Sequence, residues 1–289
     1  MHIRKAVMPV AGLGTRVLPA TKVVPKELLP IVDKPTLQYI VEEAVTAGIE
    51  EIIFVTSRSK RAIEDHFDAF PELEQALEHK GKKKELEALQ QLQQAAKYIS
   101  VRQVEPLGLG HAVLCAKELV GNEPFVVMLG DEIFAPETPP LARMLEVFEE
   151  QQKTVLSLFS VPREQIPSYG IASVEDKGAG ILQVQGLVEK PPIEEAPSDL
   201  AVAGRYILTP DIFAIIEKLE PGRGGEIQLT DALQVQAQAG NCYGIHFKGQ
   251  RYDMGNPLGL LTTSIAWGLR RPELAPALRD YMRQVLKED

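Results

Sequence analysis

The sequence predicts an α/β fold: a doubly wound, Rossmann-like mixed sheet that is flanked by helices. Strand and helix patterns alternate through the first half of the chain, and a glycine-rich turn and an acidic residue each directly follow one of these strands. Such alternation implies parallel strands with right-handed crossovers, whose ligands bind beyond the carboxyl ends of the strands. Strand patterns dominate after Thr154, and we expect these additional strands to lie over the binding face.

The first half of the chain supplies the alternating elements. Short apolar runs predict strands, and apolar residues three and four apart predict helices. Strands are expected at residues 5–12, 50–57, 98–105 and 124–132, with helices at 36–48 and after Gly110. Residues 74–97 form the most polar stretch, in which Leu86, Leu89 and Leu92 predict a surface helix with a narrow apolar stripe.

The second half of the chain predicts more sheet, followed by helices. Strand patterns occur at residues 154–162, 169–175, 180–190 and 201–208. Helical patterns occur at residues 210–219, 227–240 and from Pro257 onward. A final helix is expected from Pro272, where it docks on the body of the protein or on another subunit.

Composition and charge restrict the classes of function. The 289 residues carry 31 Lys and Arg against 40 Asp and Glu, a formal net charge of -9. This balance argues against a general binder of nucleic acid or of anionic membranes, because phosphate backbones require a cationic face. Residues 1–30, however, hold five cations and one acid, a net charge of +4. A positive island in an acidic protein favours a small, highly charged anion such as a nucleotide.

The cysteines and the amino terminus indicate a compartment. Cys115 and Cys242 are the two cysteines, and without a CxxC motif they indicate neither a disulfide framework nor a zinc site. The first residues lack the apolar core of a signal peptide, and no run approaches the ~18 apolar residues of a membrane span. We therefore expect a cytoplasmic protein without a membrane partner.

The stretch from Pro9 to Pro30, "PVAGLGTRVLPATKVVPKELLP", predicts an anion site. Gly12 and Gly14 follow a strand and allow backbone N–H groups to approach a phosphate or a base edge. Arg16 adds a forked donor that suits phosphate oxygens, and the proline-braced Lys26 can reach the same anion. Because position 17 is Val, the GxGxxG motif is incomplete, and no GxxxxGK[ST] motif follows, so a plain Rossmann oxidoreductase and a P-loop NTPase are disfavoured.

Two further motifs place charged residues at strand ends. Asp131 of "VVMLGDE" either caps a turn or faces the glycine-rich loop, where a magnesium ion would be held by few protein ligands and several phosphate oxygens. In "EKPP", Glu189 and Lys190 are expected on opposite faces of a strand, which disfavours an ordinary surface ion pair. The segment "GEIQLTDAL" from Gly225 predicts a helix start, and we assign it no catalytic role.

The chain resembles the sugar-1-phosphate nucleotidyltransferases nearly from end to end. The resemblance is carried by "PVAGLGTRVLPATKVVPKELLPIVDKP", "EPLGLGHAVLCAK", "GLVEKP", "GRYILTPDIF", "GGEIQLTDAL" and "YDMGNPLG". It implies Mg²⁺-assisted transfer of a uridylyl group from UTP to glucose 1-phosphate, which gives UDP-glucose and pyrophosphate. It also implies a single domain over residues 1–289, with a nucleotide-binding part at about 1–150 and a sugar-binding and C-terminal part at about 151–289, and a homo-oligomer, either a dimer or a tetramer.

The resemblance also implies roles for individual residues. The catalytic cations are Arg16 and Lys26, which act on the triphosphate, and Lys190, which acts on the sugar phosphate. The nucleotide is held by Ala11, Gly12, Gly14, Thr15, Gln103 and Gly108. The sugar is held by Gly170, Glu189 and Gly204, although a bulge or turn explains either glycine equally well. The metal ligands are Asp131 and Asp253.

Three other functions stay open on the sequence alone. A thymidylyltransferase that uses dTTP shares the phosphate chemistry, and Gly130–Asp131 is similar to that branch of the family. An oxidoreductase would need a nicotinamide cofactor. A catalytically silent homologue would be expected to have lost residues of the glycine loop, whereas Thr15 and Arg16 are retained.

Overall fold

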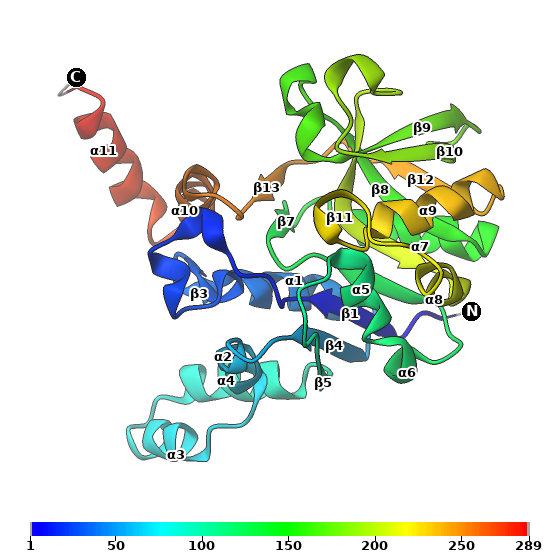
Figure 1. Ribbon diagram of the computed structural model, residues 1–289. Coiled ribbons are helices and arrows are strands. Elements are labelled where there is room, and N and C mark those ends of the chain that lie inside the picture. Colours follow the sequence, from blue (N-terminus) through cyan, green and yellow to red (C-terminus); the bar gives the residue numbers. More distant parts are fainter. Residues whose placement is uncertain (1, 288–289) are drawn as a thin grey trace.

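A nine-stranded sheet forms the centre of the computed structural model, which describes residues 2–287 (Figure 1). The strand order is β5-β4-β1-β6-β11-β8-β12-β10-β9. Its first four strands are parallel to one another and form the Rossmann-like half: β1 (Lys5–Pro9), β4 (Glu51–Thr56), β5 (Lys97–Arg102) and β6 (Phe125–Met128). Their carboxyl ends therefore meet at one edge of the sheet.

The remaining strands continue the same sheet, which confirms the expected mixed α/β fold. They are β8 (Thr154–Ser160), β9 (Gly170–Asp176), β10 (Ile181–Glu189), β11 (Leu200–Leu208) and β12 (Cys242–His246). β11 runs antiparallel to β6 and joins the two halves, and β9 at the far edge returns to pair with β11 at Ala201 and Ile171. Two small sheets complete the pairing: β2 (Pro30–Ile31) with β3 (Lys34–Pro35), and β7 (Glu132–Phe134) with β13 (Arg251–Asp253).

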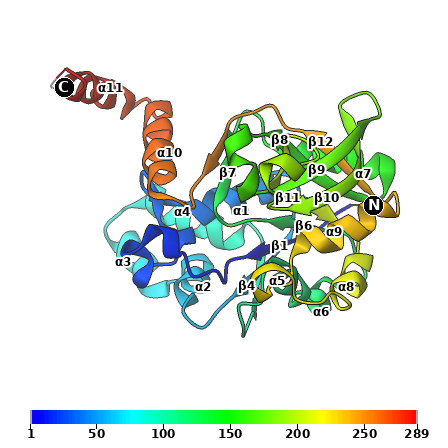
Figure 2. The ribbon, with the colours of Figure 1, turned by 45° about the horizontal axis from the view of Figure 1, so that its top comes forward.

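Helices cover both faces of the sheet (Figures 1 and 2). The helices with buried residues in one apolar cluster are α1 (Thr36–Thr46), α2 (Arg61–Phe67), α4 (Lys83–Gln94), α7 (Pro140–Gln151) and α10 (Pro257–Arg270). Those in the other cluster are α5 (Leu109–Leu114), α6 (Lys117–Val120), α8 (Asp211–Ile216) and α9 (Leu229–Gln238). Within residues 2–287, no helix has the length and apolar character that a membrane crossing requires.

The alternation of strand side chains explains the two clusters. In β1, Ala6 and Met8 belong to one cluster and Val7 to the other, and all three are fully buried. Successive strand residues point to opposite faces, so a continuous apolar run is required where both faces are covered. This is why the short runs in the first half of the sequence were sufficient to predict the central strands.

The polar stretch at residues 74–97 is two helices rather than the single helix that the sequence predicts. α3 (Pro71–His79) and α4 form a hairpin, with a turn at Gly81, whose φ is +66°. The N–H of Lys82 donates to the carbonyl of Leu77 at 2.9 Å, which closes α3 in the way that a left-handed glycine commonly ends a helix. Of the predicted apolar stripe, Leu92 is the buried member.

The last helix, α11 (Ala275–Val285), extends away from the sheet beside α10 (Figures 1 and 2). Gly268 of α10 lets the two helices approach closely, since a Cβ there would lie 2.8 Å from Leu278. The apolar residues Leu274, Tyr281 and Val285 lie seven and four positions apart and are exposed by 36%, 64% and 41%. α11 therefore presents one apolar stripe to solvent.

Candidate functional site

A cavity of about 460 Å³ lies where the two halves of the sheet meet. Six of the residues that the sequence singled out border it: Arg16, Asp131, Gly170, Glu189, Lys190 and Asp253. Arg16 and Asp131 follow strands β1 and β6 of the parallel half, whereas Gly170 and Glu189 belong to β9 and β10. The cavity thus occupies the edge at which an α/β sheet of this type binds ligands.

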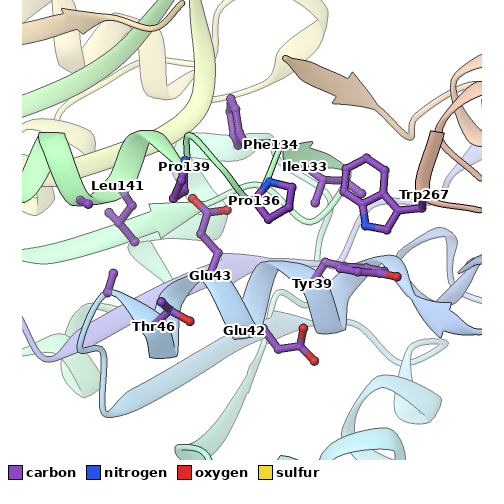
Figure 3. Close-up of a pocket in the computed structure, with 12 residues that line it drawn as sticks. Tyr39, Glu42, Glu43, Thr46, Ile133, Phe134, Pro136, Pro139, Leu141 and Trp267 are labelled. Carbon is purple, nitrogen blue, oxygen red and sulfur yellow. The ribbon is translucent and has the colours of Figure 1, made fainter. Parts of the chain in front are cut away.

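A second cavity, of about 320 Å³, lies between α1, α7, α10 and the segment after β7 (Figure 3). Its lining is mainly apolar, with Tyr39 and Trp267 at one end. Its carboxylates have partners within the protein, since Glu42 accepts from Lys34 at 2.8 Å and Glu43 accepts from Arg205 at 2.7 Å. Among the described residues, no Lys or Arg lines this cavity, so the first cavity is the candidate site for a phosphate compound.

The glycine loop is folded around Lys26. Gly14 has φ of +66°, and its carbonyl accepts from the hydroxyl of Thr21 at 2.7 Å. A Cβ at Gly14 would lie 3.2 Å from Cβ of Lys26, and a Cβ at Gly12 would lie 3.9 Å from its Cε. The absence of side chains at these positions therefore leaves room for the lysine beneath the loop, while Thr15 is exposed.

Lys26 and Arg16 both face the carboxylate of Asp131. Nζ of Lys26 donates to Oδ2 of Asp131 at 2.5 Å, and Nη2 of Arg16 lies 3.9 Å from the same oxygen. Burial opposes ionisation of Asp131, but the charges of Lys26 and Arg16 outweigh it and hold the pKa of this carboxyl below its ordinary value. The site therefore keeps one anionic and two cationic groups together near neutral pH.

A buried ion pair between Lys60 and Glu27 packs next to this cluster. Nζ of Lys60 donates to Oε2 of Glu27 at 2.7 Å, and the two side chains are only 5% and 1% exposed. Glu27 also packs beneath the strand end, because a Cβ at Gly130 would lie 3.1 Å from its Cγ. Glu27, which follows Lys26 in the chain, is thus packed against Gly130, the residue before Asp131.

The small β7–β13 sheet brings Asp253 to Asp131. Asp253 lies opposite Glu132 in the register, and the N–H of Met254 donates to the carbonyl of Asp131 at 2.8 Å. Oδ1 of Asp253 accepts from the N–H of Gly255 at 2.7 Å. Two carboxylates from distant parts of the chain therefore border the same cavity.

These two carboxylates suit a magnesium ion better than an ion that needs a full set of protein ligands. Within the part of the chain that is described, no group of three or more His, Cys, Asp or Glu residues is arranged to hold a metal. Mg²⁺ is commonly held by one or two carboxylates together with phosphate oxygens and water. Asp131 and Asp253 fit this ligand set if a triphosphate enters the cavity.

The opposite wall of the cavity carries Glu189 and Lys190. Oε1 of Glu189 lies 3.1 Å from Nζ of Lys190, so the expectation that these neighbours point to opposite faces is wrong. Lys190 follows the last residue of β10 and has φ of +45°, so strand alternation no longer applies to it. Its N–H donates to the carbonyl of Tyr169 at 2.9 Å, which fixes the turn next to Gly170.

Arg251 links Glu132, which follows Asp131, to Tyr169 on this wall. Its Nη1 lies 3.1 Å from Oε2 of Glu132, and its Nη2 donates to the hydroxyl of Tyr169 at 2.8 Å. The guanidinium also lies over the ring of Phe159, 4.1 Å from the ring centroid. Burial raises the pKa of Glu132, while the charge of Arg251 opposes that rise.

Two of the predicted nucleotide-binding residues, Gln103 and Gly108, lie together after β5. Gln103 is 7% exposed, and its Nε2 donates to the carbonyl of Gly108 at 3.0 Å and lies 3.0 Å from Nδ1 of His111. Gly108 has φ of +99°, and a Cβ there would lie 2.8 Å from the carbonyl oxygen of Ile227. In this arrangement the amide of Gln103 supports the glycine turn, whereas Ala11, which is 9% exposed, follows β1, and β4 lies between β1 and β5.

Gly204 is not among the residues that line the cavity. A Cβ at this position would lie 2.8 Å from Cβ of Leu129, and the β11–β8 register shifts between Ala203 and Tyr206. Its N–H donates to Oε2 of Glu132 at 3.1 Å. Close packing at a β-bulge therefore accounts for this glycine.

The sequence analysis missed several residues of the site. Glu132, Tyr169, Tyr206 and Thr230 also border the cavity. Thr230 lies in "GEIQLTDAL", whose pattern predicts only a helix start, and its hydroxyl donates to Oε2 of Glu189 at 2.6 Å. No local pattern indicated this contact, because the two residues are 41 positions apart.

Comparisons with known proteins identify the family of the chain. The family model described as nucleotidyl transferase matches residues 5–266. The UTP–glucose-1-phosphate uridylyltransferase of Bacillus subtilis strain 168 is 49% identical over 287 residues, which cover 99% of this chain and 98% of that protein. A second protein of the same strain, UTP–glucose-1-phosphate uridylyltransferase YngB, is 48% identical over 99% of this chain and 97% of its own length.

Solved structures show the same likeness. UDP-glucose pyrophosphorylase from Acinetobacter baumannii has a TM-score of 0.88 and 41% identity, and the match covers 100% of both chains. A UDP-glucose pyrophosphorylase in complex with UDP-glucose has a TM-score of 0.85 and 42% identity, over 93% of this chain and 100% of that one. The extent of the family match and the near full-length identity with these relatives show that the chain belongs to the nucleotidyl transferase family.

Proposed function

We propose that the protein transfers a uridylyl group from UTP to glucose 1-phosphate and releases pyrophosphate. The observation that carries this proposal is one cavity with Arg16 and Asp131 on one side and Glu189 and Lys190 on the other, with Lys26 held against Asp131. The relatives that match nearly the whole chain are uridylyltransferases by name, and one solved relative contains UDP-glucose.

In this reaction a phosphate oxygen of glucose 1-phosphate attacks the α-phosphorus of UTP in line, and pyrophosphate leaves. The attacking phosphate is already ionised near neutral pH, so no general base is required. Arg16 and Lys26 would bind the triphosphate, Lys190 the sugar phosphate and Glu189 the hexose hydroxyls. Catalysis then consists of holding the two phosphates together, neutralising their charge and excluding water.

Enzymes of this family generally use a divalent metal, and we propose that here it is Mg²⁺, with Asp131 and Asp253 as its protein ligands. When bound, the ion would neutralise charge on the triphosphate. In the structure described above, Lys26 occupies one oxygen of Asp131, so binding requires that this ion pair loosen or that the other oxygen serve as the ligand.

The thymidylyltransferase reaction is the second candidate, because dTTP presents the same polar base edge as UTP. A thymidylyltransferase-like structure from Bacillus anthracis is 24% identical with a TM-score of 0.70, which indicates a shared fold only. The 5-methyl group alone is worth about 1 to 3 kcal/mol in a pocket, so we expect a preference for UTP rather than strict exclusion of dTTP.

The test is pyrophosphate release by the purified protein from UTP, dTTP, ATP, CTP and GTP, each with glucose 1-phosphate and with other sugar 1-phosphates. We expect the highest kcat/KM for UTP with glucose 1-phosphate. A UTP to dTTP ratio of kcat/KM at or below one would assign the protein to the thymidylyl reaction. The absence of pyrophosphate release with every pair would contradict an active enzyme.

We further propose that the protein is a cytoplasmic homo-oligomer that associates through α11. The exposed stripe of Leu274, Tyr281 and Val285 is of the kind that helices bury against a partner, and the free thiols of Cys115 and Cys242 suit a reducing compartment. Light scattering should give a dimer or tetramer for the full chain and a smaller species for a chain that ends at Arg271. An unchanged mass after truncation would contradict this role of α11.

A further inference from the structure

Helix α9 is held on strand β10 by two side chains that lie one helical turn apart. Oε1 of Gln234 accepts from the N–H of Leu187 at 2.5 Å, and the hydroxyl of Thr230 donates to Oε2 of Glu189 at 2.6 Å. Four helical residues rise about 6 Å, which is close to the ~6.7 Å between alternate residues of a strand. The helix and the strand are therefore in register, and Thr230 is placed directly beside the carboxylate of Glu189.

The helix itself is anchored to the glycine turn after β5. The N–H of Ile227 donates to the carbonyl of Leu107, and the N–H of Gly110 donates to the carbonyl of Ile227, both at 2.8 Å. α9 begins two residues after Ile227. The position of Thr230 is thus fixed at one end by the turn that contains Gly108 and at the other by Gln234.

The surroundings of Glu189 leave its carboxylate few other orientations. A Cβ at Gly170 would lie 3.1 Å from both Oε2 of Glu189 and Oγ1 of Thr230, so these three residues are packed tightly. Nζ of Lys190 lies 3.1 Å from the other carboxylate oxygen. The hydroxyl of Thr230 donates its hydrogen to Glu189, so the Thr230 oxygen can only accept a hydrogen bond from a ligand.

We propose that Thr230 is a positioning residue for sugar recognition: it fixes the Glu189 carboxylate so that adjacent acceptors, on Glu189 and on Thr230 itself, face the cavity. Hydroxyl groups on neighbouring carbons of a hexose are donors that fit such a pair of acceptors. This inference rests on the proposed function, in which Glu189 binds the hexose hydroxyls. The segment "GEIQLTDAL" would then contribute to sugar specificity through Thr230.

The test compares Thr230→Val, which keeps the shape but removes the hydroxyl, with Thr230→Ser, which keeps the hydroxyl. Loss of a hydrogen bond to a charged group corresponds to a change of about tenfold or more, so Thr230→Val should raise KM for glucose 1-phosphate by about tenfold. KM for UTP should change by less than about twofold, since the hydroxyl does not contact the nucleotide side. Thr230→Ser should restore KM for glucose 1-phosphate, whereas a merely structural residue would not show this split.

Glu189→Gln tests whether the effect passes through the carboxylate. In a Glu189→Gln background, Thr230→Val should add much less than it does alone, because contacting residues are not additive. Full additivity, or an unchanged KM for glucose 1-phosphate in Thr230→Val and in Thr230→Ala, would overturn the inference. Thr262→Val, at an exposed threonine of α10, is the matched control and should leave both KM values unchanged.

The same measurements separate this inference from the proposed function. If the unaltered protein forms no UDP-glucose, the proposed function fails, and the inference fails with it. If the unaltered protein is active and Thr230→Val is indistinguishable from it, the inference alone fails.

Discussion

At the scale of single residues, the site depends on charges that are brought together from separate motifs. Asp131 is held by Lys26 and faced by Arg16, and Glu27 next to that lysine is itself neutralised by Lys60. Lys26, Asp131 and Arg16 were predicted from their motifs. The Glu27–Lys60 pair could not be, because the two residues are 33 positions apart and a charged residue in a sequence is normally read as exposed.

Asp131→Asn tests the charge at the centre of the site. The variant should fold, but removal of a preorganised charge should lower kcat by about 10²-fold or more. The measurement is kcat in saturating Mg²⁺, with Asp65→Asn, at an exposed residue of α2, as the control. Near-normal turnover would contradict a metal-binding role for Asp131.

Lys60→Met tests the buried pair. Removal of one partner leaves a buried carboxylate without compensation and should lower the free energy of unfolding at neutral pH by about 3 to 5 kcal/mol. The double variant Lys60→Met/Glu27→Gln should recover much of that loss. Urea unfolding measures both, and Lys97→Met, at a lysine whose side chain is 67% exposed, should have little effect.

The loss of unfolding free energy in Lys60→Met should depend on pH, because Glu27 titrates. Burial raises the pKa of Glu27, and the charges of Lys60 and Lys26 oppose that rise. A carboxyl whose pKa is higher in the folded chain contributes stability below its unfolded pKa and loses it as the pH rises through the folded pKa. The defect of Lys60→Met should therefore be largest near pH 8 and shrink as the pH falls toward about 5. A defect that is constant with pH would contradict an ionised Glu27.

At the scale of elements, the apolar runs of β1, β4 and β6 were predictable because both faces of these strands are buried. β7 and β13 have three residues each and carry no such run. Their pairing brings Asp253 to Asp131. The family resemblance predicted that these two residues act together, but no local sequence pattern predicted the two short strands that join them. The break between α3 and α4 was missed because one glycine in a polar helical pattern is compatible with either a continuous helix or a turn.

Gly108→Ala tests the turn between β5 and α5. Both Gly108 and Gly81 have positive φ, but a Cβ at Gly81 meets nothing within 4 Å, whereas a Cβ at Gly108 would collide with the carbonyl of Ile227. Alanine at Gly81 should cost about 1 kcal/mol of stability through backbone strain, and alanine at Gly108 should cost more, because the collision adds to the same strain. Only Gly108→Ala should also raise KM for UTP, and equal kinetic effects in the two variants would contradict a nucleotide role for this turn.

At the scale of the whole molecule, one sheet spans both sides of the cavity. β6 ends beside Asp131, β10 ends at Glu189, and β11 between them pairs with β6. The two phosphates of the proposed reaction would therefore be held by strands of one continuous sheet. That arrangement favours positioning as the main source of catalysis.

Lys190→Ala and Arg16→Ala test this division of the cavity. Because the two side chains come from opposite sides, Lys190→Ala should mainly impair the use of glucose 1-phosphate and Arg16→Ala mainly the use of UTP. Initial rates with each substrate varied in turn give the two KM values and kcat. The same defect toward both substrates in both variants would contradict separate roles.

The junction between β13 and α10 has a mechanical consequence. Asp253 ends β13, and α10 begins four residues later with Asn256 as its cap, which accepts from the N–H of Gly259 at 2.8 Å and donates to Asp253 at 3.3 Å. The N-terminus of α10 is thus hydrogen-bonded to a carboxylate that borders the cavity. A displacement of α10 would therefore also shift Asp253.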